Sequence, residues 1–149
     1  MVMRTILAAL MVIAVAAPAA AKKSEINKSF FGGVAIEGTD PVAYFTEGRP
    51  IEGSKDFAHN WKGAEWRFTS AVNRDAFKAD PGRYAPRFGG YCAFAVSRGY
   101  TASIDPEAWS IVGGRLYLNY SKSVKRQWQE DIPGNIALGE RNWPKVLDD

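Results

Sequence analysis

Two stretches decide the fold: WKGAEWRFTSAVNRDAF at residues 61–77 and VGGRLYLNYSKSVKRQW at residues 112–128. Each combines a turn glycine, an aromatic residue in the following strand, a serine that can cap a helix, and an aromatic residue in that helix. These positions recur at a constant offset of 51 residues, with Gly63, Trp66, Ser70 and Phe77 matching Gly114, Tyr117, Ser121 and Trp128. We therefore expect a small single α+β domain built from two β-hairpin-plus-helix units.

The expected strands are 57–61 and 65–69 in the first unit, and 109–112 and 116–120 in the second. Between the two units, Asp105-Pro106-Glu107 has the composition of a turn. The pattern leaves open whether the units are a true duplication, because hairpin-then-helix geometry alone can align a few positions. One shared core is expected from the bulky aromatic side chains Trp66, Phe68, Phe77, Tyr117 and Trp128.

Other helix and strand signals flank these hairpins. Asp40 precedes Pro41, so its carboxylate is expected to cap a short helix that begins there. Residues 91–96 are an apolar run after Gly89-Gly90 that could begin a helix, and a last short helix is expected within 135–142. Residues 34–36 favour a short strand.

The N-terminus is typical of a secretory signal peptide. Arg4 supplies a positive charge, residues 6–17 are uninterruptedly apolar, and Ala19-Ala20-Ala21 offers a small-residue cleavage site. The apolar run is shorter than the roughly 20 residues that span a bilayer. We expect a signal peptide at 1–21, a mature chain at 22–149, and a periplasmic or otherwise exported location with no stable membrane span after cleavage.

Charge and cysteine content narrow the class of protein. The formal net charge of +3 falls by one when Arg4 is removed, and basic and acidic residues are interspersed, so nucleic acid is not an expected partner. Cys92 is the single cysteine, which excludes an internal disulfide. Its thiol is therefore expected to be buried, bound to a ligand, or available to another molecule.

The chain resembles the YHS domain family. The resemblance is concentrated in 39–86, where Asp40-Pro41-Val42 is followed by the hairpin, the serine and the later aromatic residues. It extends through 144, past Gly89-Gly90-Tyr91-Cys92, and is similar there to small exported bacterial YHS-domain proteins. The resemblance implies a YHS-like domain over 22–149.

That resemblance implies a link to heavy metals. YHS domains occur beside copper-transporting P-type ATPases and are associated with metal binding through paired cysteines. Here Ala43 stands where metal-type members have the cysteine of "DPVCGM", and Thr69 stands where they have the cysteine of "YFCS". Both of those presumed thiolate ligands are missing.

Cys92 and His59 are the remaining candidate metal ligands. A helix that starts near Cys92 would favour its thiolate, which selects soft ions such as Cu(I). His59, the only histidine, offers a neutral imidazole. If they share one site, their donor atoms should lie within roughly 4 Å of each other. The expected partners are then a metal ion or a metal-handling protein.

Two other functions stay open from the sequence. Cys92 and His59 could form the nucleophile and base of a thiol-dependent enzyme if they are adjacent, although no local signature of such an enzyme surrounds Cys92. The chain could instead be a non-catalytic structural or partner-binding module in which Cys92 is a small buried hydrophobe. No complete catalytic site is expected.

Overall fold

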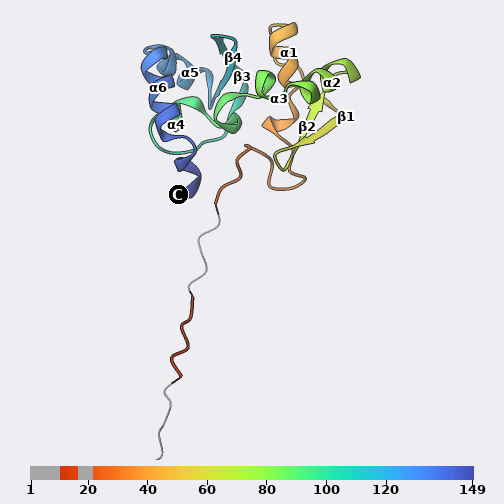
Figure 1. Cartoon of the computed structure of the whole chain (residues 1–149). Helices are drawn as coiled ribbons and strands as arrows, with labels where there is room; N and C mark the ends of the chain where they lie inside the picture. Colours follow the sequence, from red (N-terminus) through yellow and green to blue (C-terminus); the bar gives the residue numbers. More distant parts are fainter. Residues whose placement is uncertain (1–10, 17–21) are drawn as a thin grey trace, which may run out of the picture.

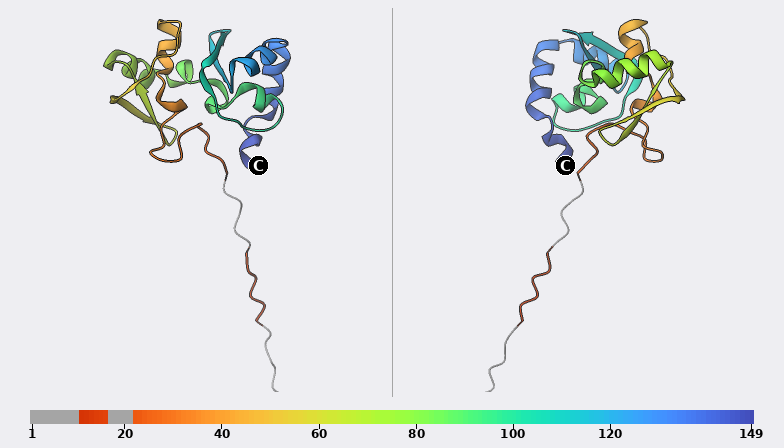
Figure 2. Two further views of the ribbon diagram at one scale, coloured as in Figure 1. Left: turned by 180° about the vertical axis from the view of Figure 1, so that it is seen from behind. Right: turned by 45° about the vertical axis from the view of Figure 1, so that its right-hand side comes forward.

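The computed structural model describes residues 11–16 and 22–149, so the predicted signal peptide at 1–21 lies largely outside the described residues. The described body has two lobes that lie side by side (Figures 1 and 2). The first lobe comprises α1 (Pro41–Thr46), β1 (Ser54–Trp61), β2 (Ala64–Phe68), α2 (Ala71–Ala79) and α3 (Pro81–Tyr84). The second comprises α4 (Ala93–Ser97), β3 (Asp105–Val112), β4 (Arg115–Asn119), α5 (Lys122–Gln129) and α6 (Ile132–Asn142).

The two hairpins share one register at the offset of 51 residues. Each is a two-stranded antiparallel sheet, in which His59 opposes Trp66 and Ser110 opposes Tyr117. Both sheets also carry a bulge near the start of their first strand, between Ser54 and Ala58 and between Asp105 and Trp109. The predicted α+β fold with two hairpin-plus-helix units is confirmed, and the repeat extends to the irregularities of the strands.

The turn residues explain why each hairpin closes so tightly. Lys62 and Gly63 have φ values of 48° and 72°, and Gly113 and Gly114 have φ values of 58° and 74°. Two successive residues with positive φ form the turn that matches the twist of a hairpin, and glycine adopts this conformation without steric cost.

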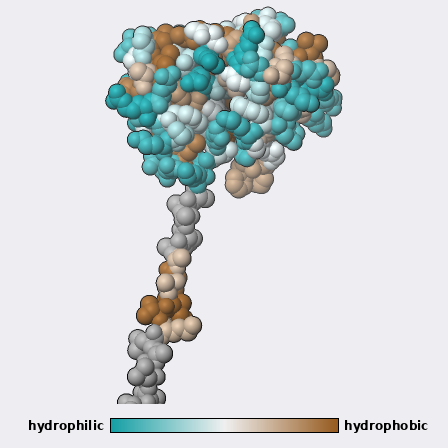
Figure 3. Space-filling view, in the orientation of Figure 1, coloured by the Kyte–Doolittle hydropathy of each residue, from teal (hydrophilic) through white to brown (hydrophobic). Residues whose placement is uncertain are grey.

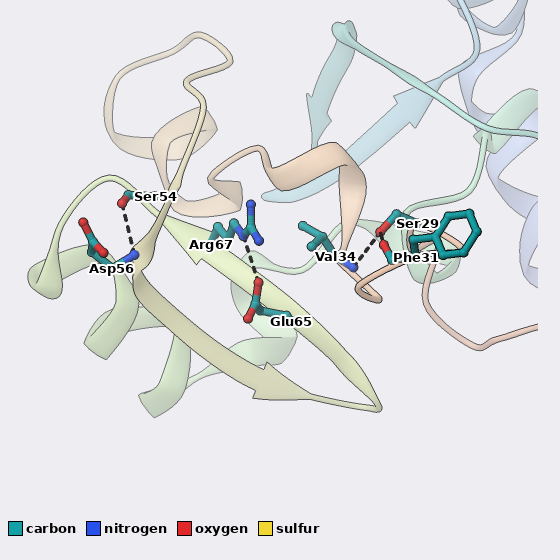
Figure 4. A network of polar contacts seen from close by, with 7 residues as sticks. All are labelled: Ser29, Phe31, Val34, Ser54, Asp56, Glu65 and Arg67. Carbon is teal, nitrogen blue, oxygen red and sulfur yellow. Dashed lines mark hydrogen bonds and ion pairs between the residues drawn. The ribbon is translucent and has the colours of Figure 1, made fainter.

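Asp105-Pro106-Glu107 begins β3, so the prediction of a turn outside the strands is wrong, although Asp105 Oδ1 accepts the Glu107 N–H at 2.9 Å, which is the turn chemistry expected of these residues. In the first unit, the corresponding bulge is supported by Ser54, whose Oγ accepts the Asp56 N–H at 3.1 Å (Figure 4). Arg67 on β2 donates to Glu65 at 2.8 Å on the same sheet. A bulge can be mistaken for a turn in the sequence because both contain polar residues and Pro.

Serine caps and aromatic pairs fix each helix against its hairpin. Ser70 accepts the Asn73 N–H, and Ser121 accepts the Val124 N–H, each at 3.1 Å. The ring centroids of Trp66 and Phe77 are 5.0 Å apart with a 32° interplanar angle. Those of Tyr117 and Trp128 are 5.2 Å apart with a 36° angle. The four expected repeat positions therefore have the same roles in both units.

The hydrophobic core is divided, contrary to the single shared core expected from sequence. Trp66, Phe68 and Phe77 belong to one buried cluster, and Tyr117 and Trp128 belong to another. The reason is that each helix packs on the strand aromatic of its own hairpin. The first cluster nevertheless continues into the second unit through Cys92, Ala95, Ile104, Leu116 and Leu118, which joins the two units.

The segment before the first unit lies against both units. Ile26 is buried, and the Asn27 backbone N–H donates to Gly89 O at 2.8 Å. The predicted strand at 34–36 is reduced to isolated bridges, since Ala35 pairs with Lys28 and residue 36 begins a short 3-10 turn, Ile36–Gly38. Within the described ranges, no helix has the length and apolarity to cross a bilayer.

Candidate functional site: the Cys92 cleft

Cys92 lies at the N-terminus of α4, on the buried side of the second unit. Its side chain is 1% exposed. Its Sγ accepts the Tyr120 N–H at 3.3 Å and contacts Asn119 Oδ1 at 3.5 Å as a thiol donor. The thiol therefore joins the start of α4 to the end of β4.

Asn119 caps α4 in place of Cys92, which makes no side-chain cap of its own. Asn119 Oδ1 accepts the Phe94 N–H at 3.0 Å, and this bond fixes which end of the amide points at the helix. The amide Nδ2 of Asn119 is buried and has no protein hydrogen-bond partner among the described residues. A buried N–H group without a hydrogen-bond partner lowers the stability of the fold, so asparagine is unexpected at position 119 of this apolar strand.

Asp40 has the equivalent position in the first unit. Its Oδ1 accepts the Val42 and Ala43 N–H groups at 2.8 and 3.2 Å, which caps α1 as predicted. Its Oδ2 accepts the Thr69 N–H at 2.8 Å, and Thr69 precedes Tyr120 by 51 residues. One carboxylate in the first unit thus fills the roles that Cys92 and Asn119 divide in the second.

The environments of Asp40 and Cys92 differ in one neighbouring side chain. Asn73 Nδ2 donates to Asp40 Oδ2 at 2.9 Å, so α2 closes over the carboxylate with a polar contact. The residue 51 positions later is Val124 on α5, which has no hydrogen-bonding group. The second unit therefore lacks the polar contact that closes the first.

A cleft of about 320 Å³ opens at this point of the second unit. Its walls come from α4, the loop after it, the end of β4, and α5. The lining residues are Cys92, Phe94, Ala95, Tyr100, Ala102, Tyr120, Val124 and Gln127. None carries a formal charge at neutral pH, so the cleft is mainly apolar, and its polar side-chain groups are the thiol, the Gln127 amide and the hydroxyls of Tyr100 and Tyr120.

Burial raises the pKa of the Cys92 thiol above its ordinary value of 9.0, and the backbone N–H groups around it offset this only in part. The prediction that the helix start favours a thiolate is therefore wrong. The helix has only five residues, and desolvation of the charged form outweighs its N–H groups. At neutral pH the site contains a neutral thiol.

Alkylation of Cys92 by iodoacetamide in the folded protein is expected to be much slower than that of a free thiol at pH 7. The rate should continue to rise above pH 9, because the reactive thiolate forms only above the raised pKa. The measurement is the pseudo-first-order rate between pH 6 and 11, with unfolded protein as control. A rate that reaches its plateau below pH 8 would contradict the neutral thiol.

His59 lies in the other unit, on β1. Its imidazole centroid is 6.4 Å from the Phe77 ring in an edge-on arrangement, and its backbone pairs with Trp66. His59 does not contribute to the lining of the Cys92 cleft. Among the described residues, His59 lies against Phe77 whereas the Cys92 thiol contacts Asn119 and Tyr120, so no hydrogen bond or ring contact joins the two predicted ligands, although Phe77 and Cys92 belong to the same buried cluster.

Across residues 11–16 and 22–149, no group of three or more His, Cys, Asp or Glu side chains is arranged to hold a metal ion.

The cleft residues other than Cys92 were not predicted from the sequence. The sequence feature that could have indicated them is the exchange of residue types at the 51-residue offset, where Phe68 corresponds to Asn119 and Asn73 corresponds to Val124.

No family model, no curated protein and no solved structure matches the chain.

Proposed function

We propose that the protein is a non-catalytic binding protein whose ligand occupies the Cys92 cleft. The observation that carries the proposal is the difference between the two units. In the first unit, the Asn73 amide covers Asp40 with a hydrogen bond. In the second unit, Val124 has the corresponding position beside Cys92 and cannot form such a bond, and a cleft of about 320 Å³ lies there. This volume is within the range of small-molecule sites.

The lining indicates the class of ligand. Phe94, Tyr100 and Val124 offer apolar surface, while Gln127 and the Cys92 thiol can orient a polar atom. An ion that does not bind the Cys92 sulfur would find no opposite charge in the lining, and burial of an unpaired ion is unfavourable. We therefore propose a small, uncharged and mainly apolar ligand.

Uncharged aromatic and aliphatic fragments are expected to bind the full chain and to shift the amide resonances of Ala95, Tyr120 and Gln127. Val124→Trp should weaken this binding at least tenfold, because the indole fills the cleft. Val72→Trp is the matched control, since Val72 is a helix valine that is 77% exposed. The measurement is titration by ¹H–¹⁵N NMR. Equal affinities in all three proteins would contradict the proposal.

Soft-metal handling is the second candidate, and the observation that favours it is that the only thiol lines an open cleft. A Cu(I) ion that entered the cleft would displace the thiol proton and bind sulfur. Competition titration of Cu(I) with the wild type, Cys92→Ser and His59→Ala tests it. Loss of affinity in both variants supports the ligand pair predicted from sequence, whereas equal affinity in all three removes this candidate.

We also propose that the protein is an exported member of the YHS family. The support is the signal-peptide pattern at 1–21 and the ordered motifs within 39–86. N-terminal sequencing of the protein recovered from the periplasm or medium should give Lys22 as the first residue. Intact Met1 in a cytoplasmic fraction would contradict export.

A further inference from the structure

A loop before the first unit carries two aromatic side chains in solvent. Phe30 is 93% exposed and Phe31 is 85% exposed, more than any other large hydrophobic residue in 22–149. Their rings contact each other edge to face, with centroids 4.9 Å apart. A tan projection at the lower edge of Figure 3 coincides with this loop, which Figure 1 places at the lower edge of the first lobe.

The loop is held in a defined conformation. Lys28 and Ala35 form an antiparallel bridge at its base, and the Ser29 N–H donates to Val34 O at 2.9 Å. Ser29 Oγ accepts the Val34 N–H at 3.0 Å and donates to Phe31 O at 2.6 Å (Figure 4). The two phenyl rings are therefore presented to solvent by an ordered loop, so little conformational entropy remains to be lost when they are buried.

The tip has the composition of a membrane-contacting wedge. After Ser29 it contains only Phe30, Phe31 and two glycines, Gly32 and Gly33, whose φ values of 80° and 61° turn the chain back. A protein partner of ordinary size needs a patch of about 800 Å² with a polar rim. A narrow apolar projection instead suits shallow insertion between lipids, where its backbone groups remain hydrated.

The charge at the base of the loop identifies the kind of lipid. Lys28 lies directly before Ser29, and its Nζ donates to Gly63 O at 2.7 Å. Within the described part of the chain, Lys28 has no carboxylate partner, whereas nearby Lys62 is paired with Glu25 at 2.6 Å. A cation behind an apolar tip is placed to meet the phosphate of an anionic headgroup.

We propose that the loop at 29–34 is a membrane-contact tip, which inserts Phe30 and Phe31 shallowly into the surface of an anionic bilayer. The tip lies outside the Cys92 cleft, so this proposal does not depend on the proposed ligand-binding function. Its affinity comes from burial of two phenyl rings and from one lysine, which predicts weak and reversible binding.

Co-sedimentation of the mature chain, residues 22–149, with phosphatidylglycerol-containing vesicles tests the proposal. Phe30→Ser with Phe31→Ser should lower the partition coefficient at least about tenfold, because two apolar side chains no longer enter the lipid. Val72→Ser is the control, since it removes another exposed apolar side chain, 77% exposed and located on α2, and should leave the partition coefficient unchanged. Every protein compared begins at Lys22, so the apolar run at 6–17 does not contribute to the partition.

A third variant separates lipid charge from apolar insertion. Lys28→Gln should weaken binding to phosphatidylglycerol vesicles and leave binding to phosphatidylcholine vesicles unchanged. Circular dichroism should show the same folded spectrum for all variants, since the substituted side chains are exposed. Equal partition of the double serine variant and the wild type would overturn the proposal. Sedimentation velocity that shows a wild-type dimer, dissociated by the double substitution without vesicle binding, would overturn it in favour of self-association.

Discussion

Replacement of Asp40 by alanine is expected to lower the free energy of unfolding by about 3–5 kcal/mol. The Asp40 side chain is fully buried and accepts hydrogen bonds from the backbone of α1 and from Thr69 and Asn73. Alanine removes the acceptor and leaves several buried donors without a partner, and each such donor costs roughly 1–3 kcal/mol. Alanine also avoids the free-energy cost of burying a carboxylate, so the loss in the free energy of unfolding is smaller than the sum of the costs of the unpaired donors.

Asp75→Ala is the matched control for Asp40. Asp75 lies on α2 and pairs with Arg74 at the surface, where an ion pair contributes little. Urea unfolding followed by circular dichroism measures both variants, and the control should change by less than about 0.5 kcal/mol. If Asp40→Ala were no more destabilising than Asp75→Ala, Asp40 would not be the residue that joins α1 to the end of β2.

Replacement of Trp128 by alanine is expected to cost about 3–5 kcal/mol through the cavity it leaves. Trp128 is fully buried, stacks on Tyr117, and anchors the second cluster. Its indole N–H has no protein partner among the described residues, so no hydrogen bond is lost and the cost is one of packing.

Phe77→Ala should have a similar cost, because Phe77 has the same place in the first unit. Val72→Ala at an exposed position is the control for both. Urea unfolding with unchanged m-values would show that the loss lies in the folded state. A cost below about 1 kcal/mol for Trp128→Ala would indicate that the second unit has no core of its own.

The parts of the fold that sequence could predict are those set by local chemistry. The glycine turns, the serine caps and the Asp40-Pro41 helix start each act within a few residues, and the structure confirms them. The division of the hydrophobic core into two clusters could not be predicted in this way. Trp66 and Tyr117 occupy equivalent strand positions, and only their three-dimensional placement decides that they contact different helices.

The candidate site depended still more on contacts distant in sequence. Cys92 could be singled out because it is the only cysteine, but its partners Asn119 and Tyr120 lie 27 and 28 residues away, at the end of β4 and directly after it. The raised pKa of the thiol likewise results from burial in a cluster formed by residues of both units, which no local pattern expresses. Val124 lines the cleft at the position that corresponds to Asn73, and this difference is visible only when the two units are compared.

The binding role of the Cys92 cleft is tested most directly by giving the second unit the Asp and Asn side chains that bond each other in the first unit. Cys92→Asp with Val124→Asn should allow the amide of residue 124 to bond the new carboxylate, as Asn73 bonds Asp40. We predict a folded protein in which fragment binding, measured by NMR titration, is weakened at least tenfold relative to the wild type. Fragment binding of undiminished affinity in a folded double variant would contradict the claim that the Cys92 cleft is the binding site.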